Sequence, residues 1–265
     1  MTRHPMTLQE VVLRLPGMET VSVRRDVHFA GSGGTPLPLD LYRPSDSPAA
    51  PLPAVMLVTG YSDVGGRQML GCSLKDMASY QGWARLIAAL GMAAVAYETA
   101  EPVVDTRAAL DHVTANAAAL GIDPARIGVW SCSGNVPNAL ALLQEPRGIA
   151  CAALCYGYML DGDGRDDVAQ AARQFGFAYP AAEASFDALR NTPLLVVRAG
   201  RDETPGLNAS VDRFVAHALA ENADITVLSY PDGPHAFDLL DDNDRSRLIV
   251  RQVLRFFEAH LLGRS

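Results

Sequence analysis

The chain lacks any long apolar segment. No run approaches the ~20 consecutive apolar residues that a transmembrane helix requires. The first residues, 1–5, also lack the apolar core of a secretory signal peptide. We therefore expect a protein that resides in the cytoplasm and does not act at a membrane.

Cysteine is scarce, with four among 265 residues. Cys151 and Cys155 are four positions apart in an expected strand, so roughly 13 Å separates them at ~3.3 Å per residue, too far for a disulfide. The cysteines therefore predict no disulfide framework, and reduced thiols fit the expected cytoplasmic location.

Positive charge is also in short supply. The chain has 22 lysines and arginines against 30 aspartates and glutamates, a formal net charge of −8. Nucleic acids and anionic membranes both bind to basic surfaces, so neither is expected as the main partner. The charge leaves the substrate open.

Cofactor motifs are missing as well. Gly65 and Gly66 are not followed by the Gly-Lys-Ser/Thr of a phosphate loop. The acidic stretch 161–167 lacks the spaced ligands and the final glutamate of an EF-hand. The sequence implies no metal ion and no organic cofactor.

Apolar patterns indicate the strands. Residues 21–29 and 37–42 alternate as half-buried strands do, and a glycine-rich hairpin-type connection, 31–34, separates them. Six later runs are continuously apolar, as in strands buried on both faces of a parallel sheet: 54–59, 92–97, 127–130, 149–155, 194–199 and 225–229.

Helical stretches separate these runs: 80–90, 102–120, 136–143, 206–220 and 245–262. Strands that alternate with helices predict an α/β fold, here a doubly wound, mostly parallel sheet with an antiparallel start. The length and the absence of linkers or repeats favour a single domain over residues 1–265. Residues 158–190 exceed what a simple crossover requires. We interpret them as a small helical cap insertion, with a long surface crossover as the alternative.

The stretch 127–135 has the strand–turn–helix context of a nucleophile elbow. The turn is so tight that the residues two before and two after the nucleophile must be small or tolerate unusual backbone angles. With Ser131 or Cys132 as nucleophile, the first slot would hold a valine or a tryptophan. Only Ser133 has a small residue there, so Ser133 is the candidate nucleophile. The far slot holds Asn135, and asparagine visits left-handed conformations more readily than most residues.

A serine nucleophile needs a base and a group that orients the base. Of six histidines, only His235 lies in a loop after the last expected strand. Its neighbours, glycine, proline and Phe237, can make that loop rigid. Asp202 follows the strand 194–199 and is the candidate acid. Glu203 is the alternative acid, and Asp202 could instead serve only as a helix cap.

The order Ser133, Asp202, His235 is that of the nucleophile-elbow fold. The sequence resembles α/β-hydrolases of the dienelactone-hydrolase and small carboxylesterase kind over about residues 35–262. The resemblance rests on the segments 39–44, 58–61 and 121–127 and on the loops that carry the candidate acid and base. Dienelactone hydrolases proper use a cysteine nucleophile, which makes dienelactone a less expected substrate for Ser133.

The resemblance implies an oxyanion hole made by two backbone N–H groups, those of Tyr61 and Gly134. Asn135 and Val136 stand where the family usually has two glycines, and Cys132 is expected to pack behind the elbow. The implied function is hydrolysis of a small-molecule carboxylic ester through an acyl-enzyme. Because the expected cap insertion is small, we expect short acyl chains to be preferred.

Other functions remain open on the same three residues. They are a peptidase, a thioesterase, an acyltransferase, and a non-catalytic hydrolase-like binding protein. A peptidase of this fold usually carries an accessory domain and an acidic pair for the substrate amine, and neither is visible. The oligomeric state is also open, a homo-oligomer included.

Overall fold

The computed structural model describes residues 3–46, 50–145, 147–161, 164–180 and 189–264. These residues form one eight-stranded sheet with the order β1-β2-β4-β3-β5-β6-β7-β8. β2 pairs antiparallel with both β1 and β4, and all remaining pairs are parallel. The strands are β1 Ser22–Ala30, β2 Pro36–Arg43, β3 Leu52–Leu57, β4 Ala93–Tyr97, β5 Ile122–Cys132, β6 Ile149–Cys155, β7 Leu194–Ala199 and β8 Ile225–Tyr230. The predicted doubly wound sheet with an antiparallel start is confirmed.

The central strands are buried on both faces, as their continuous apolar runs predict. Every residue of β3 and of β4 is buried. In β5, Val129 belongs to the hydrophobic core on one face of the sheet and Trp130 to the core on the other. Successive side chains of a strand point to opposite faces, so an apolar run of this kind fills both cores.

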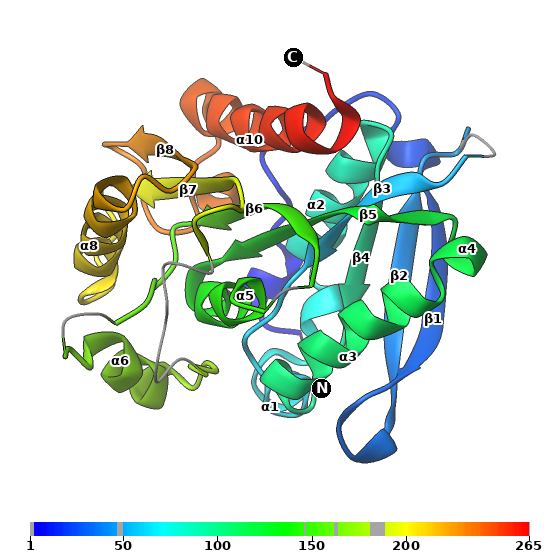
Figure 1. Ribbon diagram of the computed structural model, residues 1–265, viewed down its shortest axis with the longest axis horizontal. Coiled ribbons are helices and arrows are strands. Elements are labelled where there is room, and N and C mark those ends of the chain that lie inside the picture. The colour runs from blue at the N-terminus through cyan, green and yellow to red at the C-terminus, as the bar shows by residue number, and fades with distance from the viewer. Residues whose placement is uncertain (1–2, 47–49, 146, 162–163, 181–188, 265) are drawn as a thin grey trace.

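Helices cover both faces of the sheet (Figure 1). The cores show that α2 and α10 lie on one face, and that α3, α5 and α8 lie on the other. The helices are α1 Asp63–Leu70, α2 Ala78–Ala89, α3 Pro102–Ala115, α4 Ala117–Leu120, α5 Val136–Leu143, α6 Asp167–Phe175, α8 Leu207–Ala220, α9 Phe237–Leu240 and α10 Asp244–Phe257. No helix among the described residues is long and apolar enough to cross a membrane.

Some boundaries differ from the prediction. The helix expected over 102–120 is broken at Asn116, whose backbone (φ −106°, ψ 17°) leaves the helical region between α3 and α4. The helix expected over 245–262 ends as α10 at Phe257 and continues as one π-helical turn, Glu258–Leu262. The sequence pattern did not predict α1. None of these differences alters the order of the sheet.

The predicted insertion, 158–190, lies between β6 and β7. Residues 162–163 and 181–188 of it lie outside the described residues. The described part contains α6 and contacts the loops beside it, because the Tyr158 hydroxyl donates to the Pro205 carbonyl at 2.6 Å. The single domain over 1–265 and the role of 158–190 as a cap stay predictions.

Candidate active site

Four loops meet at the carboxyl ends of the parallel strands. Ser133 follows β5, Asp202 follows β7, His235 follows β8, and Tyr61 lies in the loop after β3. Parallel strands all end at the same edge of a sheet, and this edge is where open α/β sheets bind ligands. The sheet order therefore explains how residues distant in sequence share one site.

Ser133 lies in the tight turn between β5 and α5. Its φ of +55° is in the left-handed region, which few non-glycine residues adopt. A single 3₁₀ turn, Ser133–Asn135, connects the strand to the helix. The predicted elbow is present, and it holds the serine in a strained conformation of the kind that clusters at functional sites.

The structure brings the candidate base to the candidate nucleophile. The Ser133 Oγ and His235 Nε2 atoms are 2.9 Å apart, within hydrogen-bond distance. The His235 ring packs edge-to-face against Tyr156, with 5.3 Å between the ring centroids. The side chain of His235 is 34% exposed, so the imidazole is accessible from solvent.

The candidate acid completes the chain of contacts. Asp202 Oδ2 lies 2.6 Å from His235 Nδ1, and Asp202 Oδ1 accepts the Thr204 N–H at 2.9 Å. Burial acts to raise the pKa of Asp202, but the hydrogen bonds from His235 and Thr204 outweigh it and hold the pKa below its ordinary value. Glu203, the alternative acid, is exposed and lines a groove.

Close backbone packing holds the Asp202 and His235 loops together. A Cβ atom added to Gly200 would lie 2.2 Å from the Pro231 carbonyl oxygen, so only glycine fits at this crossing. The Arg201 N–H also donates to the Gly233 carbonyl at 2.9 Å. The glycines of these loops therefore permit the close approach that brings Asp202 to His235.

The Tyr61 loop lies directly over the elbow. A Cβ atom on Gly134 would lie 2.3 Å from the Tyr61 hydroxyl oxygen and 3.0 Å from the Phe177 ring. Tyr158 stacks on Phe177, with 5.3 Å between the ring centroids. Aromatic side chains thus line the space beside the candidate nucleophile. Burial raises the pKa of Tyr61 to about 12, so its hydroxyl stays neutral.

Cys132, the neighbour of Ser133, has the wrong environment for a nucleophile. Burial raises the pKa of its thiol to about 12, so the reactive thiolate is scarce at neutral pH. The partly buried side chain packs against the core that contains Trp130. This location agrees with the expected packing role.

No sequence pattern predicts the buried polar network beneath His235. The Tyr156 hydroxyl donates to Asp238 Oδ1 at 2.6 Å, and Trp83 Nε1 donates to Asp238 Oδ2 at 2.8 Å. Burial raises the pKa of Asp238, and the two hydrogen bonds oppose that effect only in part. The partners lie 82 and 155 positions from Asp238, so no local pattern predicts them. The network supports the ring on which the imidazole packs.

The surface is hollowed beside His235. An open groove of about 630 Å³ has one wall from the insertion and another from the acid and base loops. The residues that line it with His235 are Phe175, Arg201, Glu203, Thr204, Pro205 and Pro234. The imidazole of His235 is therefore accessible from solvent through this groove.

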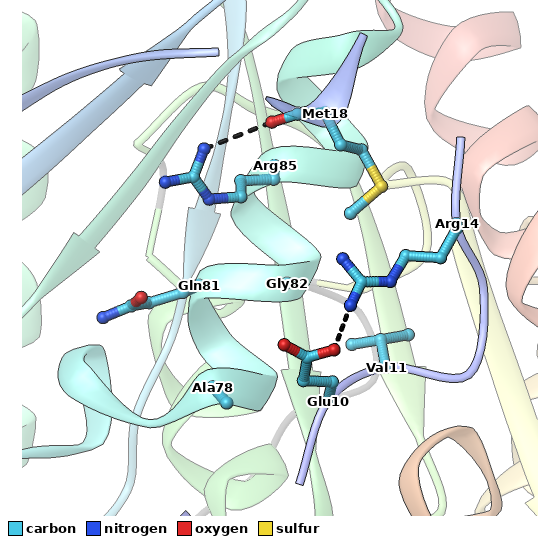
Figure 2. Close-up of a pocket in the computed structure, with 8 residues that line it drawn as sticks. All are labelled: Glu10, Val11, Arg14, Met18, Ala78, Gln81, Gly82 and Arg85. Atoms are coloured by element: carbon cyan, nitrogen blue, oxygen red, sulfur yellow. Dashed lines mark hydrogen bonds and ion pairs between the residues drawn. The ribbon is translucent and has the colours of Figure 1, made fainter. Parts of the chain in front are cut away.

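A separate pocket of about 130 Å³ lies between the N-terminal segment and α2 (Figure 2). Figure 2 shows Arg14 paired with Glu10, and the Arg85 guanidinium donating to the Met18 carbonyl. Its lining residues include no serine, cysteine or histidine. The pocket therefore lacks residues of the kind that make Ser133 and His235 the candidate nucleophile and base.

Solved structures resemble this fold along most of the chain. A bacterial heroin esterase aligns with a TM-score of 0.70 and 19% identity over 96% of this chain and 88% of that one. The fold is thereby settled. The chain has the α/β-hydrolase fold. Among the structures that share it, an esterase from Pyrobaculum calidifontis has a TM-score of 0.67 and 21% identity, covering 90% of this chain and 85% of its own.

A third similar structure is an ester-hydrolase from the metagenome of Lake Arreo in complex with a derivative of bipyridine phosphonate. This α/β-hydrolase match has a TM-score of 0.68 and 19% identity over 92% of this chain and 84% of that one. No protein-family model matches the sequence, and no curated protein matches it at a significant level. The narrower resemblance to dienelactone hydrolases stays a prediction.

Proposed function

We propose that this protein is a serine hydrolase that cleaves carboxylic esters through an acyl-enzyme. The observation that carries the proposal is the continuous chain of contacts from Ser133 to His235 at 2.9 Å and from His235 to Asp202 at 2.6 Å. An ionised carboxylate can only accept hydrogen bonds, so Nδ1 of the imidazole carries the proton that faces Asp202. Nε2 is then free to accept the proton of the Ser133 hydroxyl.

In the first half of the reaction, Ser133 Oγ attacks the ester carbonyl carbon while His235 Nε2 takes its proton. The N–H groups of Tyr61 and Gly134 bind the oxyanion that forms. When the tetrahedral intermediate collapses, the carbon–oxygen bond to the alcohol breaks and His235 gives the proton to the leaving oxygen.

In the second half, water attacks the acyl carbon and gives its proton to His235. The intermediate collapses again, the acid leaves, and the proton returns to Ser133 Oγ. Asp202 holds the imidazole in one tautomer and stabilises the positive charge that the ring carries in each half. The ester and one water molecule are thus converted into an alcohol and an acid, and the named residues return to their starting state.

The crowding over Gly134 supports small esters as the substrate class. The Tyr61 and Phe177 side chains occupy the space over Gly134, 2.3 Å and 3.0 Å from where a Cβ atom would lie. The similar heroin esterase and the similar ester-hydrolase with its phosphonate derivative support ester chemistry for this site by analogy. We therefore propose short acyl chains, with the alcohol part facing the open groove beside His235.

Two serine variants test the proposal. We expect Ser133→Ala to lower kcat/KM for p-nitrophenyl acetate by ~10³-fold or more, because no other group replaces the nucleophile. Ser131→Ala is the matched control. Ser131 is buried in β5 and its hydroxyl donates to the Val58 carbonyl at 3.2 Å, so the variant should keep activity within a few-fold.

Rates measured on p-nitrophenyl esters of increasing acyl length test the chain-length preference on the same wild-type protein. We expect the rate to fall as the acyl chain lengthens. Full activity of Ser133→Ala would contradict the proposed nucleophile, and a preference for long chains would contradict only the proposed substrate class.

A further inference from the structure

Hydrogen bonds hold three successive carbonyls of the loop between β3 and α1, those of residues 59–61. The Thr59 carbonyl accepts Asn138 Nδ2 at 2.6 Å, the Gly60 carbonyl accepts the Ala178 N–H at 2.7 Å, and the Tyr61 carbonyl accepts the Thr99 hydroxyl at 2.9 Å. The donors come from α5, from the insertion and from the loop after β4. Three separate parts of the molecule therefore fix this short loop.

The N–H groups of the same loop differ from one another. The Gly60 N–H donates to Asn135 Oδ1 at 2.7 Å. The Tyr61 N–H has no acceptor among the residues that the structure describes. A backbone N–H beside the candidate nucleophile thus remains available to a ligand, whereas its neighbour does not.

Two asparagines bind opposite ends of one peptide group. The Thr59 carbonyl and the Gly60 N–H belong to the same planar amide, and Asn138 holds the first while Asn135 holds the second. Both asparagine side chains are buried, and they lie three residues apart at the start of α5. Rotation of this peptide plane would break both hydrogen bonds at once.

Asn135 links the loop to the elbow itself. Its Nδ2 donates to the Cys132 carbonyl at 2.9 Å and to the Tyr80 hydroxyl at 3.1 Å. The backbones are also in contact, because a Cβ atom on Gly60 would lie 2.8 Å from the Gly134 carbonyl oxygen. The position of the loop is therefore set relative to the backbone that carries Ser133.

We propose that Asn135 and Asn138 are positioning residues that hold the Thr59–Gly60 peptide so that the next N–H, that of Tyr61, binds the oxyanion. This inference rests on the proposed ester hydrolysis. In a trans peptide the carbonyl and the N–H point in opposite directions. With the Gly60 carbonyl bound to Ala178, the Tyr61 N–H is directed away from the insertion. Asn135, which occupies a position where glycine is usual, thereby acquires a role in the reaction.

Kinetics of asparagine variants test the inference. We expect Asn135→Ala and Asn138→Ala each to lower kcat for p-nitrophenyl acetate on the order of 10- to 10²-fold, below the 10²–10³-fold typical of a donor lost outright. KM should change little, because the donor acts on the transition state. The loss of kcat in the double variant should be little larger than that in the more impaired single variant, because both side chains hold one peptide.

A transition-state analogue separates positioning from general damage. A trifluoromethyl ketone forms a tetrahedral oxyanion with the serine, so its inhibition constant should rise in step with the loss of kcat. The inhibition constant of a neutral amide that mimics the ground state should stay the same. Asn243→Ala is the control for lost stability alone, because Asn243 caps α10 through the Ser246 N–H, and it should lower Tm but not kcat.

Asn135→Asp keeps an oxygen that can accept the Gly60 N–H, so it should retain more of kcat than Asn135→Ala. It also serves as a second test if the alanine variant does not fold. A folded Asn135→Ala with unchanged kcat, or a loss of kcat without weaker ketone binding, would overturn the inference. Wild-type protein that hydrolyses no ester would instead contradict the proposed function, and with it this inference.

Discussion

The carboxylate of Asp202 is bound at both oxygens. One oxygen accepts the Thr204 N–H and shapes the turn after β7, and the other faces His235 Nδ1. The side chain has no exposed surface, whereas its neighbour Glu203 is exposed. The turn thus orients the carboxylate towards the imidazole. The alternative role of Asp202 as a helix cap is wrong, because α8 begins after Gly206 and no side chain caps it.

Neutralising this carboxylate should impair the reaction. We expect Asp202→Asn to lower kcat for p-nitrophenyl acetate by ~10²–10⁴-fold, because an amide no longer fixes the imidazole tautomer or stabilises its charge. Glu203→Gln is the matched control: because Glu203 lines only the groove, the variant can change KM but should lower kcat far less. A larger loss of kcat in Glu203→Gln than in Asp202→Asn, measured by steady-state kinetics, would contradict the assignment of Asp202 as the acid.

The thiol of Cys132 should be inert despite its place beside Ser133. Its pKa of about 12 keeps it protonated at pH 8, so we expect no modification of folded protein by iodoacetamide at this residue. Peptide mass spectrometry after alkylation measures this directly, with urea-unfolded protein as the positive control. Rapid alkylation of Cys132 accompanied by loss of activity would argue for a reactive thiol.

The candidate residues differ in how far the sequence predicts them. Ser133 is predictable because the tight turn imposes a steric rule on its close neighbours. His235 and Asp202 are predictable because each follows an apolar strand. The contacts of Asn135 with the loop after β3 and of Tyr156 with Asp238 span 75 and 82 positions, and they depend on the packed fold.

At the scale of elements, the elbow and the loop after β3 pack backbone against backbone, with no space for a side chain between them. Gly60 lies against backbone atoms of Gly134 and Asn135, which cannot rotate away as a side chain can. The elements that carry the candidate nucleophile and the proposed oxyanion donor are therefore held in a fixed relative position. The close backbone contact and the hydrogen bonds of Asn135 and Asn138 together hold this geometry.

Adding one methyl group at this contact should disturb the site more than the fold. Gly60→Ala places a Cβ atom 2.8–2.9 Å from the elbow backbone. We expect it to lower kcat/KM by ~10-fold or more, because the Tyr61 N–H shifts. Gly65→Ala, where nothing lies within 4 Å, should keep activity and raise stability by up to ~1 kcal/mol. Kinetics and thermal unfolding of both variants test this, and an active Gly60→Ala would contradict it.

The elements that the sequence predicts are those whose pattern matches their burial. The central strands are apolar because both of their faces are covered. Helix α1 escapes prediction because two adjacent glycines and few apolar residues weaken the local pattern. Its ends are instead determined by tertiary contacts of Asp63 and by Gly71, which closes the helix at a φ of +78°.

At the scale of the molecule, the buried Asp63 joins three parts of the chain. One oxygen accepts the Leu74 N–H at 2.7 Å and the other the Thr99 N–H at 2.8 Å. Burial raises its pKa from 3.8 to about 6, and the nearby Glu98 adds to this while the backbone hydrogen bonds and Arg67 oppose it. Folding is therefore linked to the protonation of this carboxyl.

The contribution of Asp63 to the free energy of unfolding should fall as the pH rises from about 4 to about 6. In that window the folded protein still binds a proton that the unfolded chain has released, and by pH 7 a shift of this size corresponds to roughly 3 kcal/mol. Asp63→Asn does not titrate, so the stability advantage of wild type over the variant should shrink between about pH 4.5 and pH 7. Urea unfolding at several pH values measures it, and a constant difference would refute the linkage.

The proposed ester hydrolysis depends on attack by the Ser133 Oγ atom, and covalent labelling tests this most directly. A fluorophosphonate reacts with a serine that an adjacent base activates. We expect intact-mass spectrometry to show one adduct per wild-type chain, peptide mapping to locate it on Ser133, and Ser133→Ala to remain unlabelled. Wild-type protein that stays unlabelled, or an adduct on another residue, would contradict the proposed serine hydrolase.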